Sequence, residues 1–178
     1  MRRDLVLYRH AKAGLGRPGG SDHDRPLTGR GRRAAVAIAA ALVARGAPPD
    51  LILCSTALRT RETLEPLLAR LTPTPPVSLE PGLYLASAQA LLARLRQVPG
   101  DVERVILIGH NDGMAELARA LATSGDPAAL GAIAIKYPTG AAACLRATLD
   151  DWSDLGHADV YLEAFLRPRD LMTGAPNP

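Results

Sequence analysis

Two histidines and two arginines are the residues of this sequence best placed to do chemistry. Arg9 and His10 follow the apolar run LVLY, Ser55 and then Arg59 follow DLILC, and His110 follows VILIG. A neutral imidazole can act as a nucleophile or a hydrogen-bond donor, and guanidinium groups bind the oxygens of compact anions through forked donor pairs. If these residues meet in the fold, they form a pocket for a compact dianion, and a phosphoryl group matches it best.

The three apolar runs that precede these residues are predicted to be strands of a parallel sheet. Their Val, Ile and Leu residues show no polar alternation, which is typical of strands covered on both faces. Helical patterns follow the runs, over 29–45, 56–71, 87–97 and 112–122, and Pro- and Gly-rich segments separate them. The alternation predicts a three-layer α/β/α sandwich with a mostly parallel central sheet. Ligands of such sheets bind beyond the carboxyl ends of the strands, where the four side chains should meet.

The last part of the chain is predicted to add three strands at one edge of the sheet. They are AIAIKY (132–137), AAACLRATL (141–149) and VYLEAFL (160–166). The segment 167–178 contains three prolines, and we expect it to form a loose tail at the surface. A chain of 178 residues fits one domain with a sizeable core, so we expect a single domain over 1–178.

The composition favours a cytoplasmic protein that is not bound to a membrane. No apolar run approaches the roughly 20 residues that a membrane-spanning helix needs. The apolar run after the two N-terminal arginines is too short for the core of a signal peptide. Cys54 and Cys144 lie far apart inside apolar runs, which is typical of buried, reduced thiols.

The charge balance indicates anionic partners without indicating nucleic acid. The net charge is +3, and 19 of the 21 basic residues are arginines, since the chain has only two lysines. Aromatic residues make up only 3% of the chain and the arginines are scattered, so base-stacking platforms are not expected. His10, His23, His110 and His157 show no paired metal-ligand spacing, so neither a metal nor another cofactor is expected.

Five motifs, in order along the chain, resemble the histidine phosphatase superfamily, which includes the phosphoglycerate mutases. RHA (9–11) is similar to its Arg-His-Gly motif, SxxxRTxxT (55–63) to its second arginine motif, and GHN (109–111) to its second histidine motif. SDHDRPLTGRG (21–31) and YPTGAAACL (137–145) resemble more narrowly the SixA-type branch, the phosphohistidine phosphatases. The alanine of RHA departs from the superfamily glycine, a departure common in the small branch.

The resemblance implies a phosphoglycerate mutase-like fold and a metal-independent phosphatase that works through a phosphorylated histidine. His10 would be the nucleophile that carries the phosphoryl group, and Arg9 and Arg59 would bind its equatorial oxygens. His110 would bind a remaining phosphoryl oxygen, a role that the resemblance alone supplies. Arg61 is not chosen, because it points to another side of the predicted helix than Arg59.

Several further residues have two interpretations each. Arg25, in the DRPLT segment, is a candidate for substrate binding, but Asp22 or Asp24 could hold it in a structural ion pair. Asn111 is a candidate for substrate binding, although Asn111 or Asp112 could instead cap the following helix. For Ser55 we expect helix capping, because no nucleophile elbow surrounds it.

Glu80 is the one acidic residue in the region where larger superfamily members place a general acid, although a loop role suits it better. Without an acid, an alkoxide is hard to expel, whereas the imidazole of a phosphohistidine leaves readily. The sequence therefore predicts hydrolysis of phosphohistidine in a phosphorylated protein, such as a histidine phosphotransfer domain, with inorganic phosphate as product. The alternatives are a small-molecule phosphomonoesterase and a phosphate-binding module without turnover.

Overall fold

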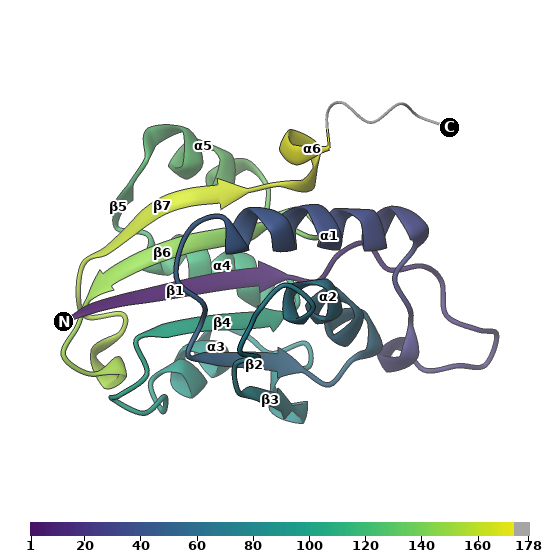
Figure 1. Cartoon of the computed structure of the whole chain (residues 1–178), viewed down its shortest axis with the longest axis horizontal. Helices are drawn as coiled ribbons and strands as arrows, with labels where there is room; N and C mark the ends of the chain where they lie inside the picture. The colour runs from purple at the N-terminus through teal and green to yellow at the C-terminus, as the bar shows by residue number, and fades with distance from the viewer. Residues whose placement is uncertain (173–178) are drawn as a thin grey trace.

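The computed structural model describes residues 1–172 and arranges them around one seven-stranded sheet (Figure 1). The strand order is β3-β2-β4-β1-β6-β7-β5. All neighbouring pairs are parallel except those that β6 makes with β1 and β7. The strands are β1 (Arg2–Arg9), β2 (Leu51–Ser55), β3 (Val77–Glu80), β4 (Arg104–Gly109), β5 (Ser124–Gly125), β6 (Ala142–Thr148) and β7 (Val160–Leu166). The mostly parallel sheet predicted from the sequence is confirmed.

Helices cover both faces of the sheet (Figure 1). On one face lie α1 (Gly29–Val43) and α2 (Leu58–Leu68), with the short α6 (Pro168–Leu171) packed on α1. The other face carries α3 (Ala88–Leu95), α4 (Gly113–Leu121) and α5 (Pro127–Ile135). Three single turns of 3-10 helix complete the fold: η1 (Asp22–Asp24), η2 (Pro81–Leu83) and η3 (Trp152–Asp154). Within residues 1–172, no helix has the length and apolar character needed to cross a bilayer.

The central strand β1 shows why the apolar runs lack polar alternation. Leu5 and Leu7 point into the core beneath α3 and α4, whereas Val6 and Tyr8 pack in the core beneath α1 and α2. Leu7 and Tyr8 are both fully buried. Because successive side chains of a strand point to opposite faces, a strand covered on both faces needs apolar residues at every position.

The C-terminal part differs from the sequence prediction in two places. The predicted strand over 132–137 is wrong, because 132–135 form the end of α5, whose first turn is capped by Asp126 accepting from the Ala129 amide. The predictions over 141–149 and 160–166 are confirmed as β6 and β7. Part of the expected loose tail is the helix α6, and 173–178 lie outside the described residues.

Arg3 is a fully buried cation that fastens the start of β1 to two loops. Its side chain is 1% exposed and donates to the carbonyls of Val102 (2.7 Å), Gly100 (2.8 Å) and Asp150 (2.7 Å). Arg3→Met should lower the free energy of unfolding by about 3 kcal/mol, since buried carbonyls lose a charged donor. Urea denaturation measures the change. The control Arg2→Met removes an exposed arginine and should change it by less than about 0.5 kcal/mol; equal effects would contradict this role of Arg3.

Candidate active site

The carboxyl ends of β1 and β2 open into a cavity of about 570 Å³. Four residues singled out in the sequence line it, namely Arg9, His10, Arg25 and Arg59. His110, which follows β4, lies beside them, with its ring centroid 5.2 Å from that of His10. The other lining residues are Lys12, Ala13, Asp22, Leu85 and Thr139. Residues a hundred positions apart in the sequence therefore meet at one edge of the sheet.

His10 is held with one ring nitrogen occupied and the other available. Its Nδ1 donates to the carbonyl of Ala11 at 2.8 Å, which leaves the Nε2 lone pair free. Burial is the main reason that the pKa of His10 falls to about 4, and the charges of Arg59 and Arg9 lower it further. At neutral pH the ring is therefore uncharged, as a nucleophile must be.

The backbone around His10 is fixed by its neighbours on both sides. The amide of His10 donates to Gly109 O at 3.0 Å, and the amide of Gly140 donates to His10 O at 2.8 Å. Gly140 has a φ of 78°, a left-handed conformation that favours glycine. The Thr139-Gly140 turn thus supports the loop after β1 and places Thr139 on the cavity wall.

Arg59 enters the cavity from a buried position and Arg9 from a half-buried one. Arg59 is 3% exposed, and its guanidinium donates to the carbonyl (2.7 Å) and the carboxylate (3.0 Å) of Asp22. Thr63, one turn further along α2, donates to Arg59 O and accepts from the amide of Ala11, so it ties α2 to the loop after His10. Arg9 donates to Tyr137 O at 2.7 Å, and its buried Nε has no partner among the described residues.

Asp22 links the arginines, and the sequence did not identify it as part of the site. Its carboxylate accepts from the Tyr84 hydroxyl (2.6 Å), Arg25 (2.9 Å) and Arg59 (3.0 Å). These hydrogen bonds, that of Tyr84 first, hold the pKa of Asp22 well below its usual range. Arg25 forms the ion pair with Asp22 that one of its two interpretations predicted, and it also lines the cavity.

His110 is buried more deeply than His10. It is 1% exposed, and its Nε2 shares a hydrogen bond of 2.8 Å with the hydroxyl of Ser55. Burial, followed by the charges of His10 and Arg59, lowers the pKa of His110 to about 3. Its buried Nδ1 has no partner within the described part of the chain, so this nitrogen is available to a ligand. Ser55 differs from its expected role: it orients His110, while Ala57 occupies the cap position of α2.

Two residues singled out in the sequence are not brought to the cavity. Burial alone would raise the pKa of Glu80, but two hydrogen bonds from Arg94, at 2.7 and 2.8 Å, contribute to holding it below its usual value. A carboxylate kept ionised in this way is a poor proton donor. Asn111 donates to Tyr137 O at 3.2 Å and is not among the lining residues, and neither Asn111 nor Asp112 caps α4 through its side chain.

Tyr84 and His23 complete the wall of the site, and the sequence carried little signal for either. The edge of Tyr84 lies against His110, with ring centroids 5.4 Å apart, and the Arg59 guanidinium lies 5.7 Å from the centre of the Tyr84 ring. His23 is partly buried and hydrogen-bonded to Thr56 at 2.9 Å. Over residues 1–172, His, Cys, Asp and Glu side chains do not group in threes that could hold a metal ion.

The burial of both histidines predicts an acid-shifted titration. NMR of the imidazole rings should give midpoints near pH 4 for His10 and near pH 3 for His110, well below the ordinary value of about 6.5. Because the unfolded chain binds these protons more readily, the two rings should also make stability fall on acidification below about pH 6.5. A midpoint near 6.5 for either ring would show that burial does not hold it neutral.

Comparison with known proteins agrees with this geometry. Residues 5–84 match the model of the histidine phosphatase superfamily (branch 1). An uncharacterized protein of Mycobacterium tuberculosis is 35% identical over 164 residues, which are 90% of this chain and 99% of the relative. The candidate phosphohistidine phosphatase SixA of Nakamurella multipartitia is 32% identical, with a TM-score of 0.81 over 94% of this chain and 97% of its own.

The structure of a third relative contains a bound oxyanion. It is a protein histidine phosphatase SixA complexed with tungstate, 25% identical, with a TM-score of 0.74 over 94% of this chain and 99% of its own. Together these similarities cover nearly the whole chain. The chain belongs to the histidine phosphatase superfamily, in its SixA-type branch.

Proposed function

We propose that the protein hydrolyses phosphohistidine in a phosphorylated protein, through a covalent phosphoryl group on His10. The observation that carries the proposal is the neutral His10 ring, with Nε2 free, in a cavity that also holds Arg9, Arg25 and Arg59. In the first step Nε2 attacks phosphorus, a new N–P bond forms, and the N–P bond of the substrate breaks. Water then attacks the phosphoryl group on His10, which releases inorganic phosphate and restores the ring.

The arginines stabilise the charge of the transferred group. Phosphoryl transfer depends mainly on positioning and on donors aimed at the equatorial oxygens, where charge resides in the transition state. Arg59, which is buried, and Arg9, which is half-buried, present guanidinium groups held by hydrogen bonds, which suits this role. His110 would donate from Nδ1 to a further oxygen, since Ser55 occupies its Nε2.

The acidic groups of the cavity favour phosphohistidine over a phosphomonoester. Among the described residues that line the cavity, Asp22 is the sole carboxylate, and its lowered pKa keeps it ionised. Glu80 is held by Arg94 outside the cavity. Without a proton donor, an alkoxide leaves slowly, whereas the imidazole of phosphohistidine is a weak base and leaves readily.

The relatives support the same chemistry. Two of them are described as phosphohistidine or protein histidine phosphatases, and the second binds tungstate, a tetrahedral oxyanion like phosphate. A partner protein that carries phosphohistidine, such as a histidine phosphotransfer domain, is the substrate that we infer. The buried thiols of Cys54 and Cys144 fit the cytoplasm as its compartment.

The test compares kcat/KM for a phosphorylated histidine phosphotransfer domain with kcat/KM for a panel of aryl and alkyl phosphates. We expect the phosphoprotein to be preferred over alkyl phosphates by at least about 100-fold, because alkyl phosphates need a general acid. Glu80→Gln should leave every rate within about twofold, since Glu80 makes no contact in the cavity. Rapid turnover of an alkyl phosphate that Glu80→Gln abolishes would contradict the proposal and favour a small-molecule phosphomonoesterase.

A further inference from the structure

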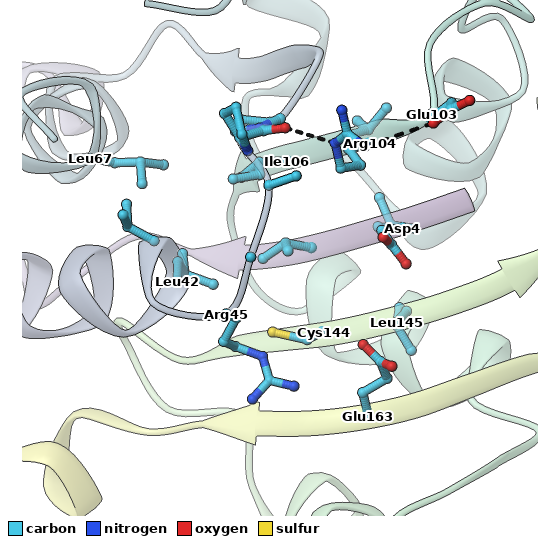
Figure 2. A pocket seen from close by; sticks show the side chains of 18 of the residues that line it. Asp4, Leu42, Arg45, Leu67, Glu103, Arg104, Ile106, Cys144, Leu145 and Glu163 are labelled. Carbon is cyan, nitrogen blue, oxygen red and sulfur yellow. Dashed lines mark hydrogen bonds and ion pairs between the residues drawn. The ribbon is translucent and has the colours of Figure 1, made fainter. Parts of the chain in front are cut away.

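A second cavity, of about 420 Å³, lies at the opposite end of the strands from His10 (Figure 2). Its lining includes Asp4, near the start of β1, and Arg104, at the start of β4, whereas His10 and His110 follow the ends of these strands. The C-terminal ends of α1 and α2 supply the other side. Its volume falls within the range of about 300 to 1,000 Å³ that small-molecule sites occupy.

The floor of this second cavity is apolar. It is formed by side chains of three neighbouring strands and of the two helices above them, namely Val6, Ile106, Cys144, Leu42, Val43 and Leu67. Ile106 and Leu67 belong to the core beneath α1 and α2, and Cys144 beside them is buried, so the cavity is an opening into that core. A ligand that enters it removes apolar surface from water.

The charged side chains around the mouth are paired with one another, with one exception. The guanidinium of Arg2 lies 3.0 Å from the carboxylate of Asp4, and that of Arg104 lies 3.7 Å from the carboxylate of Glu103. Glu163 forms an ion pair with Arg146, which lies just outside the lining. These pairs neutralise the mouth and leave little net charge to attract a ligand.

Arg45 is the exception. Within the described residues no carboxylate lies within ion-pair distance of its guanidinium, and Figure 2 shows it reaching from the end of α1 over β6, beside Cys144. Burial raises the pKa of the Cys144 thiol to about 11, so the thiol stays protonated and cannot serve as a counter-ion. Arg45 is exposed and contacts the Cys144 thiol, but it has no carboxylate partner among the described residues. Such a guanidinium at the edge of an apolar cavity is suited to an anionic head group.

We propose that the second cavity binds an amphiphilic monoanion, a medium-chain fatty carboxylate, with its carboxylate on Arg45 and its chain on the apolar floor. The chain gains from leaving water, and each methylene that is buried strengthens binding by about fourfold. The carboxylate receives two parallel hydrogen bonds from the guanidinium. This site is separate from the phosphatase chemistry and does not depend on it.

Decanoate and decan-1-ol test the proposal, since they share a chain and differ in the charged head. Both are used below their micelle concentrations, and binding to the full chain is followed by displacement of the fluorescent anion 8-anilinonaphthalene-1-sulfonate. We expect decanoate to bind more tightly than decan-1-ol. Arg45→Gln should weaken the binding of decanoate by about tenfold and leave the binding of decan-1-ol unchanged, because only decanoate carries a charge that pairs with the guanidinium.

Two control variants separate the cavity from other surfaces. Arg33→Gln removes an exposed arginine of α1, the helix that Arg45 follows, and should leave decanoate binding unchanged. Cys144→Leu fills the cavity and should weaken the binding of decanoate and of decan-1-ol by similar factors. Circular dichroism verifies that the variant is folded. Equal affinity for decanoate and decan-1-ol, equal losses in Arg45→Gln and Arg33→Gln, or no effect of Cys144→Leu in a folded protein would each overturn the proposal.

Discussion

His10→Ala is expected to lower kcat on a phosphohistidine substrate by at least about 10⁴-fold while the fold survives. The reason is that the methyl group offers no nitrogen to phosphorus, and no other ring can take over. His110 lies 5.2 Å away between ring centroids, and its Nε2 is bound to Ser55. Steady-state kinetics on the variant, with thermal melting to verify the fold, measures the effect.

The matched control for this variant is His157→Ala. His157 is exposed and shares a hydrogen bond with Arg96. It is distant in the sequence from the cavity residues and does not line the cavity. We expect this variant to keep kcat within about twofold of the parent. A His10→Ala protein that turns over substrate as fast as His157→Ala would remove His10 from the reaction.

Arg59→Lys should lower kcat/KM by about 10²- to 10³-fold, although it keeps the positive charge. Lysine has a single ammonium group, whereas the guanidinium of Arg59 donates from two nitrogens at once, at present to the carbonyl and carboxylate of Asp22. Two parallel donors are what the equatorial oxygens of a phosphoryl group require. The same kinetics measure the loss, with vanadate inhibition as an independent measure of oxyanion binding.

Arg61→Lys is the matched control, because Arg61 lies on the same helix but is exposed and outside the cavity lining. We expect this variant to keep kcat/KM within about twofold. If Arg59→Lys and Arg61→Lys had the same small effect, the second arginine motif would serve the fold rather than the reaction.

The sequence allowed the sheet and four residues of the cavity to be predicted because both depend on local patterns. The runs that became β1, β2 and β4 are apolar at every position, and each ends in a polar residue at the same edge of the sheet. The strand predicted over 132–137 was wrong, because a short apolar stretch without periodicity fits a buried helix as well as a strand. The signal for the helix lay upstream, in the cap Asp126 and the following Pro127.

The roles of Asp22, Tyr84 and Ser55 could not be predicted in the same way. Each depends on a partner distant in the sequence. Asp22 accepts a hydrogen bond from the hydroxyl of Tyr84, 62 residues further along the chain, and Ser55 shares a hydrogen bond with His110, 55 residues further along. The spacing of residue types along one segment carries no information about such tertiary hydrogen bonds. Glu80 shows the converse, since its region of the chain suggested an acid but Arg94, on α3, holds it ionised.

The most direct test of the account is to look for the phosphoryl group on His10 itself. The protein is mixed with a radiolabelled phosphohistidine substrate, quenched with base after a short pulse, digested, and the labelled peptide is sequenced by mass spectrometry. The account predicts an acid-labile, base-stable label on the peptide that contains His10, and its absence from His10→Ala. Efficient release of phosphate with no label on the protein at any time, or a label on another residue, would contradict it.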